Sequence, residues 1–246
     1  MALASVLAIL CALAPNAFAQ QLEPPPGKYR TSWVGNSFGG DGGPNGLGYW
    51  VQNGADEIEV SPEGAVIAGT DWDEAGRRVG LYKDGKCNRV LLKQEKGKET
   101  AWGWNTGNHA IAVNGDQIFV ANTGKRLLRF RWTPGDLDSA KFVDEVELLD
   151  KAVALNSRGE KLVVGYAGRI ELRRISDMGV ISGFDLADVR DLTVAPDQSL
   201  WVIAGGRILH LDRDGKEAGP GITSIPKATA VAFDNQGRLI VCDDGP

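Results

Sequence analysis

The sequence is poor in the residues that build metal and nucleophile sites. It has two histidines, His109 and His210, and three cysteines, Cys11, Cys87 and Cys242. So few imidazoles make a zinc or copper site with several histidine ligands implausible. No Gly-x-Ser-x-Gly segment occurs, so nothing nominates a serine nucleophile of the elbow type. His210 falls at an apolar position of a strand pattern, which predicts a hydrogen-bonded core residue.

A surplus of positive charge is also missing. The chain has 27 Lys and Arg residues against 32 Asp and Glu residues, and its net charge is -5. Proteins that bind nucleic acid neutralise phosphates with clustered basic residues. We therefore expect no nucleic-acid partner.

Long apolar runs are absent after the first nineteen residues, which carry no charge and end in the small-x-small segment Ala17–Ala19. This pattern predicts a signal peptide over residues 1–19, a mature start at Gln20 and export to the periplasm or the exterior. The run is shorter than the roughly 20 helical residues that span a bilayer, so we expect no stable membrane insertion after processing. Outside the cytoplasm, Cys87 and Cys242 could form a disulfide or remain two buried thiols.

The chain does contain a repeated strand pattern. An apolar-x-apolar phrase, followed by a turn and a second apolar run, occurs at Ile58–Val60, Ile111–Val113, Val153–Leu155, Leu192–Val194 and Val231–Phe233. The first residues of these phrases are 53, 42, 39 and 39 positions apart. A period near 40 residues is typical of propeller blades. We predict an all-β fold, a β-propeller of four-stranded antiparallel blades over residues 56–246.

The second apolar runs align as Val66–Ala68, Ile118–Val120, Leu162–Val164, Leu200–Val202 and Leu239–Val241. Phe119 and Trp201 occupy the central position of this run and are predicted to pack between blades. Four blades are complete and the fifth is partial. The connector 20–55 contains two aromatic segments, Ser32–Val34 and Tyr49–Val51, that could close a five-membered ring. The alternative, favoured by the abrupt end of the fifth blade, is a fragment of a larger ring.

Two phrases resemble a known family. Ala110–Asn114 with Ile118–Ala121, and Ala230–Asp234 with Leu239–Val241, are similar to repeats of the NHL-repeat and gluconolactonase-like group of six-bladed propellers. The likeness covers about residues 56–246 and implies the architecture more specifically than the activity, because the group includes lactonases, lyases and binding scaffolds. A calcium-dependent lactonase of this kind would use oxygen ligands, here Glu57, Asn156 and Asp191.

Polar residues precede the inner strands at matching positions. Two residues before each repeated phrase stand Asp56, His109, Lys151, Arg190 and Thr229. Because inner strands of a propeller begin at one mouth of the channel, we predict that these residues form one tier there, with Glu57 and Asp191 beside them, that binds a ligand or moves a proton. The alternative is that they are ordinary loop residues.

Tryptophans offer a second candidate binding surface. Trp72, Trp102 and Trp104 are flanked by Gly, Asn, Asp or Thr, as in exposed loops, and flat rings with nearby amides suit sugar faces. Packing between blades is the alternative. The sequence thus predicts a secreted binding module for a carbohydrate or protein ligand, without a cofactor other than a possible calcium ion. A calcium-dependent lactonase and a spacer for another domain are the alternatives.

Overall fold

The computed structural model describes residues 55–70, 79–83, 86–91, 93–95, 98–100, 110–122 and 124–245. All of them fall within the compact unit Gly35–Pro246. The predicted leader, the connector up to residue 54 and its two aromatic segments lie outside the described residues. The described residues contain strands and turns and no helix. They therefore include no helix that could span a membrane.

Four antiparallel sheets of four strands follow one another along the chain. The first consists of β1 (Ala55–Val60), β2 (Val66–Thr70), β3 (Val79–Lys83) and β4 (Lys86–Val90). The second consists of β7 (Ala110–Asn114), β8 (Gln117–Asn122), β9 (Arg126–Thr133) and β10 (Asp136–Glu147). The third consists of β11 (Ala152–Arg158), β12 (Lys161–Tyr166), β13 (Arg169–Arg174) and β14 (Val180–Asp185).

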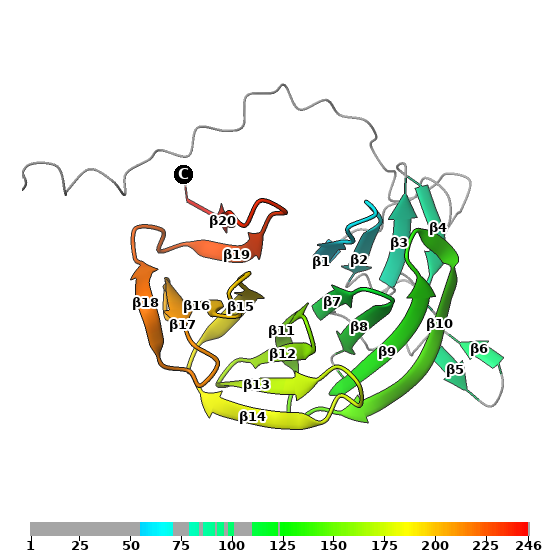
Figure 1. Ribbon diagram of the computed structural model, residues 1–246, viewed down its shortest axis with the longest axis horizontal. Helices are drawn as coiled ribbons and strands as arrows, with labels where there is room; N and C mark the ends of the chain where they lie inside the picture. The colour runs from blue at the N-terminus through cyan, green and yellow to red at the C-terminus, as the bar shows by residue number, and fades with distance from the viewer. Residues whose placement is uncertain are drawn as a thin grey trace, which may run out of the picture. The chain divides into compact units, whose positions relative to one another are not determined.

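The fourth sheet consists of β15 (Val189–Val194), β16 (Leu200–Ala204), β17 (Arg207–Leu211) and β18 (Glu217–Ile222). A two-stranded fifth sheet pairs β19 (Ala228–Phe233) with β20 (Leu239–Asp243). Figure 1 shows the sheets arranged around a common centre, with β7, β11, β15 and β19 innermost and β10, β14 and β18 at the periphery. Neighbouring inner strands contact one another from β1 through β7, β11 and β15 to β19. This arrangement confirms the predicted β-propeller with four complete blades and a partial fifth.

The blades pack face to face through apolar side chains that alternate along the strands. Phe119 is fully buried between the second and third blades, in a cluster with Leu155 and Tyr166. Trp201 packs between the fourth and fifth blades beside Val231, in a separate cluster. Both placements were predicted from the repeat. Because each interface excludes water from two sheet faces, the hydrophobic effect supplies the main force that holds successive blades together.

Two faces at the ends of this series are not covered by any described residue. Ile58 and Val60 on β1 are each 59% exposed, and Ile240 on β20 is 47% exposed. Their counterparts in the complete interior blades are buried, such as Leu192 at 2%. The exposure follows from position in the series, since no described blade lies on these sides.

The sequence pattern located the inner and second strands but not the fourth ones. The outer strands are largely exposed, as β14 and β18 show, so apolar alternation does not mark them. β18 even contains Pro220, which an edge strand tolerates because the missing N–H would face solvent. The long first period holds an additional hairpin, β5 (Lys93–Glu95) with β6 (Lys98–Thr100).

Candidate functional site

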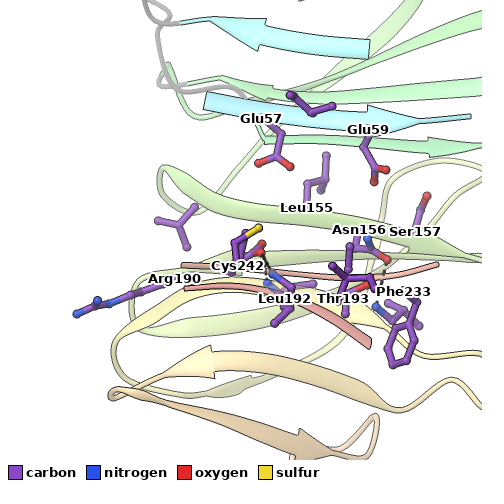
Figure 2. Close-up of a pocket in the computed structure, with 18 of the residues that line it drawn as sticks. Glu57, Glu59, Leu155, Asn156, Ser157, Arg190, Leu192, Thr193, Phe233 and Cys242 are labelled. Atoms are coloured by element: carbon purple, nitrogen blue, oxygen red, sulfur yellow. Dashed lines mark hydrogen bonds between the residues drawn. The ribbon is translucent and has the colours of Figure 1, made fainter. Parts of the chain in front are cut away.

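The inner strands enclose a cavity of about 590 Å³. Its lining comes from β1, β7, β11, β15, β19 and β20, strands that are far apart in the sequence. Apolar walls are supplied by residues such as Leu155 and Leu192, and polar groups by residues such as Asn156, Ser157 and Thr193. Figure 2 shows Glu57 and Glu59 extending from β1 into this space, toward the strand that carries Leu155 and Asn156.

Glu59 is half-buried in this cavity. The pKa of its carboxyl group is raised from the ordinary value of 4.5 to about 7, chiefly by burial. A hydrogen bond from the Val60 N–H opposes this shift, and the negative charge of Asp191 contributes to it. A carboxylate is disfavoured where water cannot solvate it. Glu59 therefore exchanges its proton in the neutral pH range.

Asp191 is a further half-buried acid of the cavity. Burial raises its pKa from 3.8 to about 6, although backbone N–H groups of Val231 and Leu192 favour the charged form. The Leu192 N–H donates to Oδ1 over 2.8 Å, and the Val231 N–H donates to Oδ2 over 2.7 Å. Since Val231 belongs to β19, Asp191 ties the fourth blade to the fifth.

Other polar side chains of the lining also bind the neighbouring blade. The Asn156 Oδ1 accepts a hydrogen bond from the Val194 N–H over 3.2 Å. The Ser157 hydroxyl donates to the Val113 carbonyl over 3.0 Å, on the opposite side of the same blade. These bonds satisfy backbone groups of the inner strands, which a sheet edge would otherwise leave unpaired.

The predicted tier is only partly assembled by the described residues. Arg190 and Thr229 line the cavity, whereas Lys151 does not. The side chain of Asp56 and the whole of His109 lie outside the described residues, as do Trp72, Trp102 and Trp104. Whether these residues bind a ligand stays a prediction.

The position of Lys151 reflects an error of two residues in the predicted register. β11 continues through Asn156 to Arg158, and Arg158 pairs with Lys161 across a two-residue turn. The sequence had instead suggested a turn that begins at Asn156. In the observed ladder Leu155 faces Val164, as Leu192 faces Val202 in the next blade. Lys151 is therefore two residues too early to match Arg190.

The three predicted calcium ligands Glu57, Asn156 and Asp191 do line the same cavity. However, the Asn156 oxygen already accepts a backbone hydrogen bond from Val194. Among the described residues, no group of three His, Cys, Asp or Glu side chains could hold a metal ion. Calcium usually takes six to eight oxygen ligands, so these residues fit such a site poorly.

His210 is hydrogen-bonded, as predicted, although it is half-buried and not fully in the core. Its Nε2 lies 3.0 Å from the Ser199 hydroxyl, and that hydroxyl donates to Asp197 Oδ1 over 2.6 Å. The imidazole stacks on Trp201 with ring centroids 4.4 Å apart. In a hydrolase triad the histidine lies between the acid and the serine. Here the serine is central, so the network has the wrong order for a nucleophile and stabilises the fourth blade.

Two residues of the cavity were missed at the level of the sequence. Glu59 shares one face of β1 with Glu57, and this two-residue spacing was the signal that could have revealed it. Cys242 lines the cavity from β20 and is a free, exposed thiol. It is not in a disulfide with Cys87, whose side chain lies outside the described residues.

Comparisons with known proteins agree on the fold. No family model and no curated protein sequence matches the chain. Among solved structures, it is similar to the glutaminyl cyclase of Myxococcus xanthus, with a TM-score of 0.52, 12% identity, and coverage of 73% of this chain and 82% of that one. The WD40 β-propeller domain of Doa1 matches with a TM-score of 0.57, 12% identity, and coverage of 79% and 62%.

A third similar structure is the hydrazine synthase of Kuenenia stuttgartiensis, with a TM-score of 0.56, 14% identity, and coverage of 87% of this chain and 58% of that one. At such low identity the likeness shows the fold alone. Together with the radial sheets and the channel-lining inner strands, it defines the chain as a β-propeller. The site chemistry has to be argued from the residues of this chain.

Proposed function

We propose that this chain is a secreted binding module that holds a carbohydrate or protein ligand in its central cavity. The observation that carries the proposal is the cavity itself, about 590 Å³ between the inner strands. Ligand sites commonly measure about 300–1,000 Å³ and combine apolar walls with a few polar groups. Export and the relationship to the NHL-repeat and gluconolactonase-like propellers, with six blades, belong to the same proposal.

The composition of the lining supports binding. Glu59 and Asp191 offer hydrogen-bonding groups, while Ile58 and Ile240 supply apolar area. His210, the histidine in the described part of the chain, stacks on Trp201 and does not line the cavity. A module that recognises a ligand needs complementary groups at fixed positions, and rigid inner strands provide them.

Hydrogen exchange tests this function. The full chain would be incubated with a panel of neutral oligosaccharides and short peptides, and amide exchange would be followed by strand. A ligand of the cavity should slow exchange in β11 and β15 more than in the outer strands β14 and β18. A panel that leaves the inner strands unchanged would count against the cavity as a ligand site. A Trp102→Ala variant separates cavity binding from binding at the predicted tryptophan surface.

The calcium-dependent lactonase is the second candidate. Its support is that Glu57, Asn156 and Asp191 line one cavity, although their hydrogen bonds suit the ion poorly. Addition of calcium should then raise the melting temperature, and the protein should open lactone substrates. If calcium changes neither the melting temperature nor the turnover, this candidate is refuted.

A further inference from the structure

The central cavity contains two acids that have no cationic partner in the described part of the chain. Asp191 is bound by two backbone N–H groups, and Glu59 by the backbone N–H of Val60. No described lysine or arginine forms an ion pair with either one. Buried charge without an opposite charge is unfavourable. No described cation neutralises the carboxylates of Glu59 and Asp191 when they are ionised.

The two arginines of the lining do not neutralise these acids. Arg158 donates from Nη1 to the Val194 carbonyl over 3.5 Å. Arg190 is exposed and pairs with Asp188, with 3.7 Å between Nε and Oδ1. Both guanidinium groups are thus directed to partners other than Glu59 and Asp191.

A comparison between blades shows that Glu59 is not needed to join them. Glu59 faces Ile67 across its hairpin, and Asn156 faces Val163 across the equivalent hairpin of the third blade. Asn156 is neutral, and its Oδ1 accepts a hydrogen bond from the Val194 N–H of the next blade. Glu59 makes no corresponding bond with the next described blade, so its carboxyl group is available to the cavity.

Part of the remaining wall is apolar, beside polar residues such as Asn156 and Ser157. Ile58 and Ile240 line the cavity with accessible apolar surface, at 59% and 47% exposure. Acidic groups beside aliphatic walls match a ligand that has a positive end on an aliphatic stem. Lysine and arginine side chains have this form, with an apolar stem and a charged head.

We propose that the central cavity binds an ammonium or guanidinium group on an aliphatic stem, with Glu59 and Asp191 as its counter-ions. The inference rests on the proposed function and specifies the class of ligand. A cation between the two acids would stabilise both carboxylates and form charge-assisted hydrogen bonds. The lysine or arginine side chain of a protein partner and a free polyamine share this chemistry.

Binding should depend on pH, because the cation attracts Glu59 only in its ionised form. The titratable and charged groups that face it in the described lining are Glu57 on β1, Arg158 on β11, Arg190 and Asp191 on β15, and Cys242 on β20. The pKa of Glu59 is raised to about 7 and that of Asp191 to about 6. Affinity for the cation should therefore increase as the pH rises through this range.

The test uses the full chain and two matched peptides, acetyl-Gly-Lys-Gly-amide and the same peptide with norleucine in place of lysine, with spermidine as a free amine. Calorimetric titration near pH 8 should give an affinity for the lysine peptide about tenfold or more above that for the norleucine peptide. Glu59→Gln should remove most of this difference. Glu63→Gln removes a charge from an exposed turn of the same hairpin and should leave it unchanged.

The free thiol of Cys242 reports where the peptide binds. In a Cys11→Ser, Cys87→Ser background, the lysine peptide should slow alkylation of Cys242, and Glu59→Gln should abolish the protection. Spermidine that binds as tightly as the lysine peptide would identify a free amine as the source of the cation, and tighter binding of the peptide would identify a protein.

Equal affinity of wild type for the lysine and norleucine peptides would overturn the inference. If neutral oligosaccharides still slow exchange in the inner strands, the proposed function survives that result. If no ligand affects either the inner strands or Cys242, both fail. Circular dichroism of Glu59→Gln confirms that a loss of binding does not come from loss of the fold.

Discussion

The stability of the Glu59→Gln variant tests whether the cavity holds a desolvated acid. Glutamine has nearly the same shape as glutamate and carries no charge. The pKa of Glu59 is raised from 4.5 to about 7, chiefly by burial. By linkage, such a difference between the unfolded and folded states corresponds to about 3 kcal/mol of unfolding free energy.

The sign follows from which state holds the proton more tightly. Between pH 4.5 and about 7 the folded protein retains the Glu59 proton that the unfolded chain has lost. The free energy of unfolding of the wild type therefore decreases as the pH rises through this window. Above it the folded state contains an ionised, poorly solvated carboxylate. Glutamine cannot ionise, so the variant does not show this loss.

The assay is urea unfolding of wild type and variant, each near pH 5 and near pH 8. The variant should gain about 2–3 kcal/mol relative to wild type between these two conditions. For a chain of this size, that corresponds to a rise in melting temperature of roughly 4–12 °C. Glu63→Gln, which removes a charge from an exposed turn of the same hairpin, is the matched control.

A difference between Glu59→Gln and wild type that stays constant with pH would refute this reasoning. It would mean that the Glu59 carboxyl titrates alike in the folded and unfolded states. The desolvation that supports the cation site would then be absent, whatever the overall stability of the variant.

Three further predictions concern the contacts between blades and the cavity thiol. Arg129→Met should lower the unfolding free energy by about 3 kcal/mol in a urea titration. The reason is that this buried guanidinium pairs with a carboxylate and donates to two carbonyls of the third blade. The exposed control Arg131→Met should lower the unfolding free energy by about 1 kcal/mol or less in the same titration. Asp191→Ala should accelerate amide exchange at Val231, its hydrogen-bond partner, and unchanged exchange there would show that the bond does not join the blades. Cys242 should react with a thiol reagent without denaturant because it is exposed, and mass spectrometry that finds it protected would contradict this.

The fold could be predicted from the sequence wherever burial imposes a pattern. The inner and second strands of the interior blades are largely buried, so phrases such as Ile111–Val113 and Ile118–Val120 recur with their turn at a fixed spacing. The outer strands were missed because water covers them and their composition is free. The register of β11 was also missed, since its turn lies at Gly159 and Glu160 and not at Asn156.

The site was harder to predict, because alternation along a strand gives the face of a residue but not its surroundings. Glu57 and Asp191 were identified as polar residues near the inner strands, and both line the cavity. Each stands directly before one of the repeated phrases, so their equivalent positions can be read from the sequence. Glu59 was missed because its significance comes from its burial in the cavity and from its nearness to Asp191, more than a hundred residues later. Only the closure of the sheets around a common centre brings the two together.

The contrast between Asn156 and Glu59 explains why the cavity is the part of the fold most suited to function. At the same position of two blades, asparagine forms a blade-to-blade hydrogen bond and is neutral. Glutamate at that position forms no such bond with a described residue and carries a charge that burial disfavours. Packing alone would favour asparagine or an apolar residue in the first blade as well. Residues that lower stability where a neutral residue would serve the fold better are typical of functional sites. A cation that binds beside Glu59 and stabilises its charge would recover that stability.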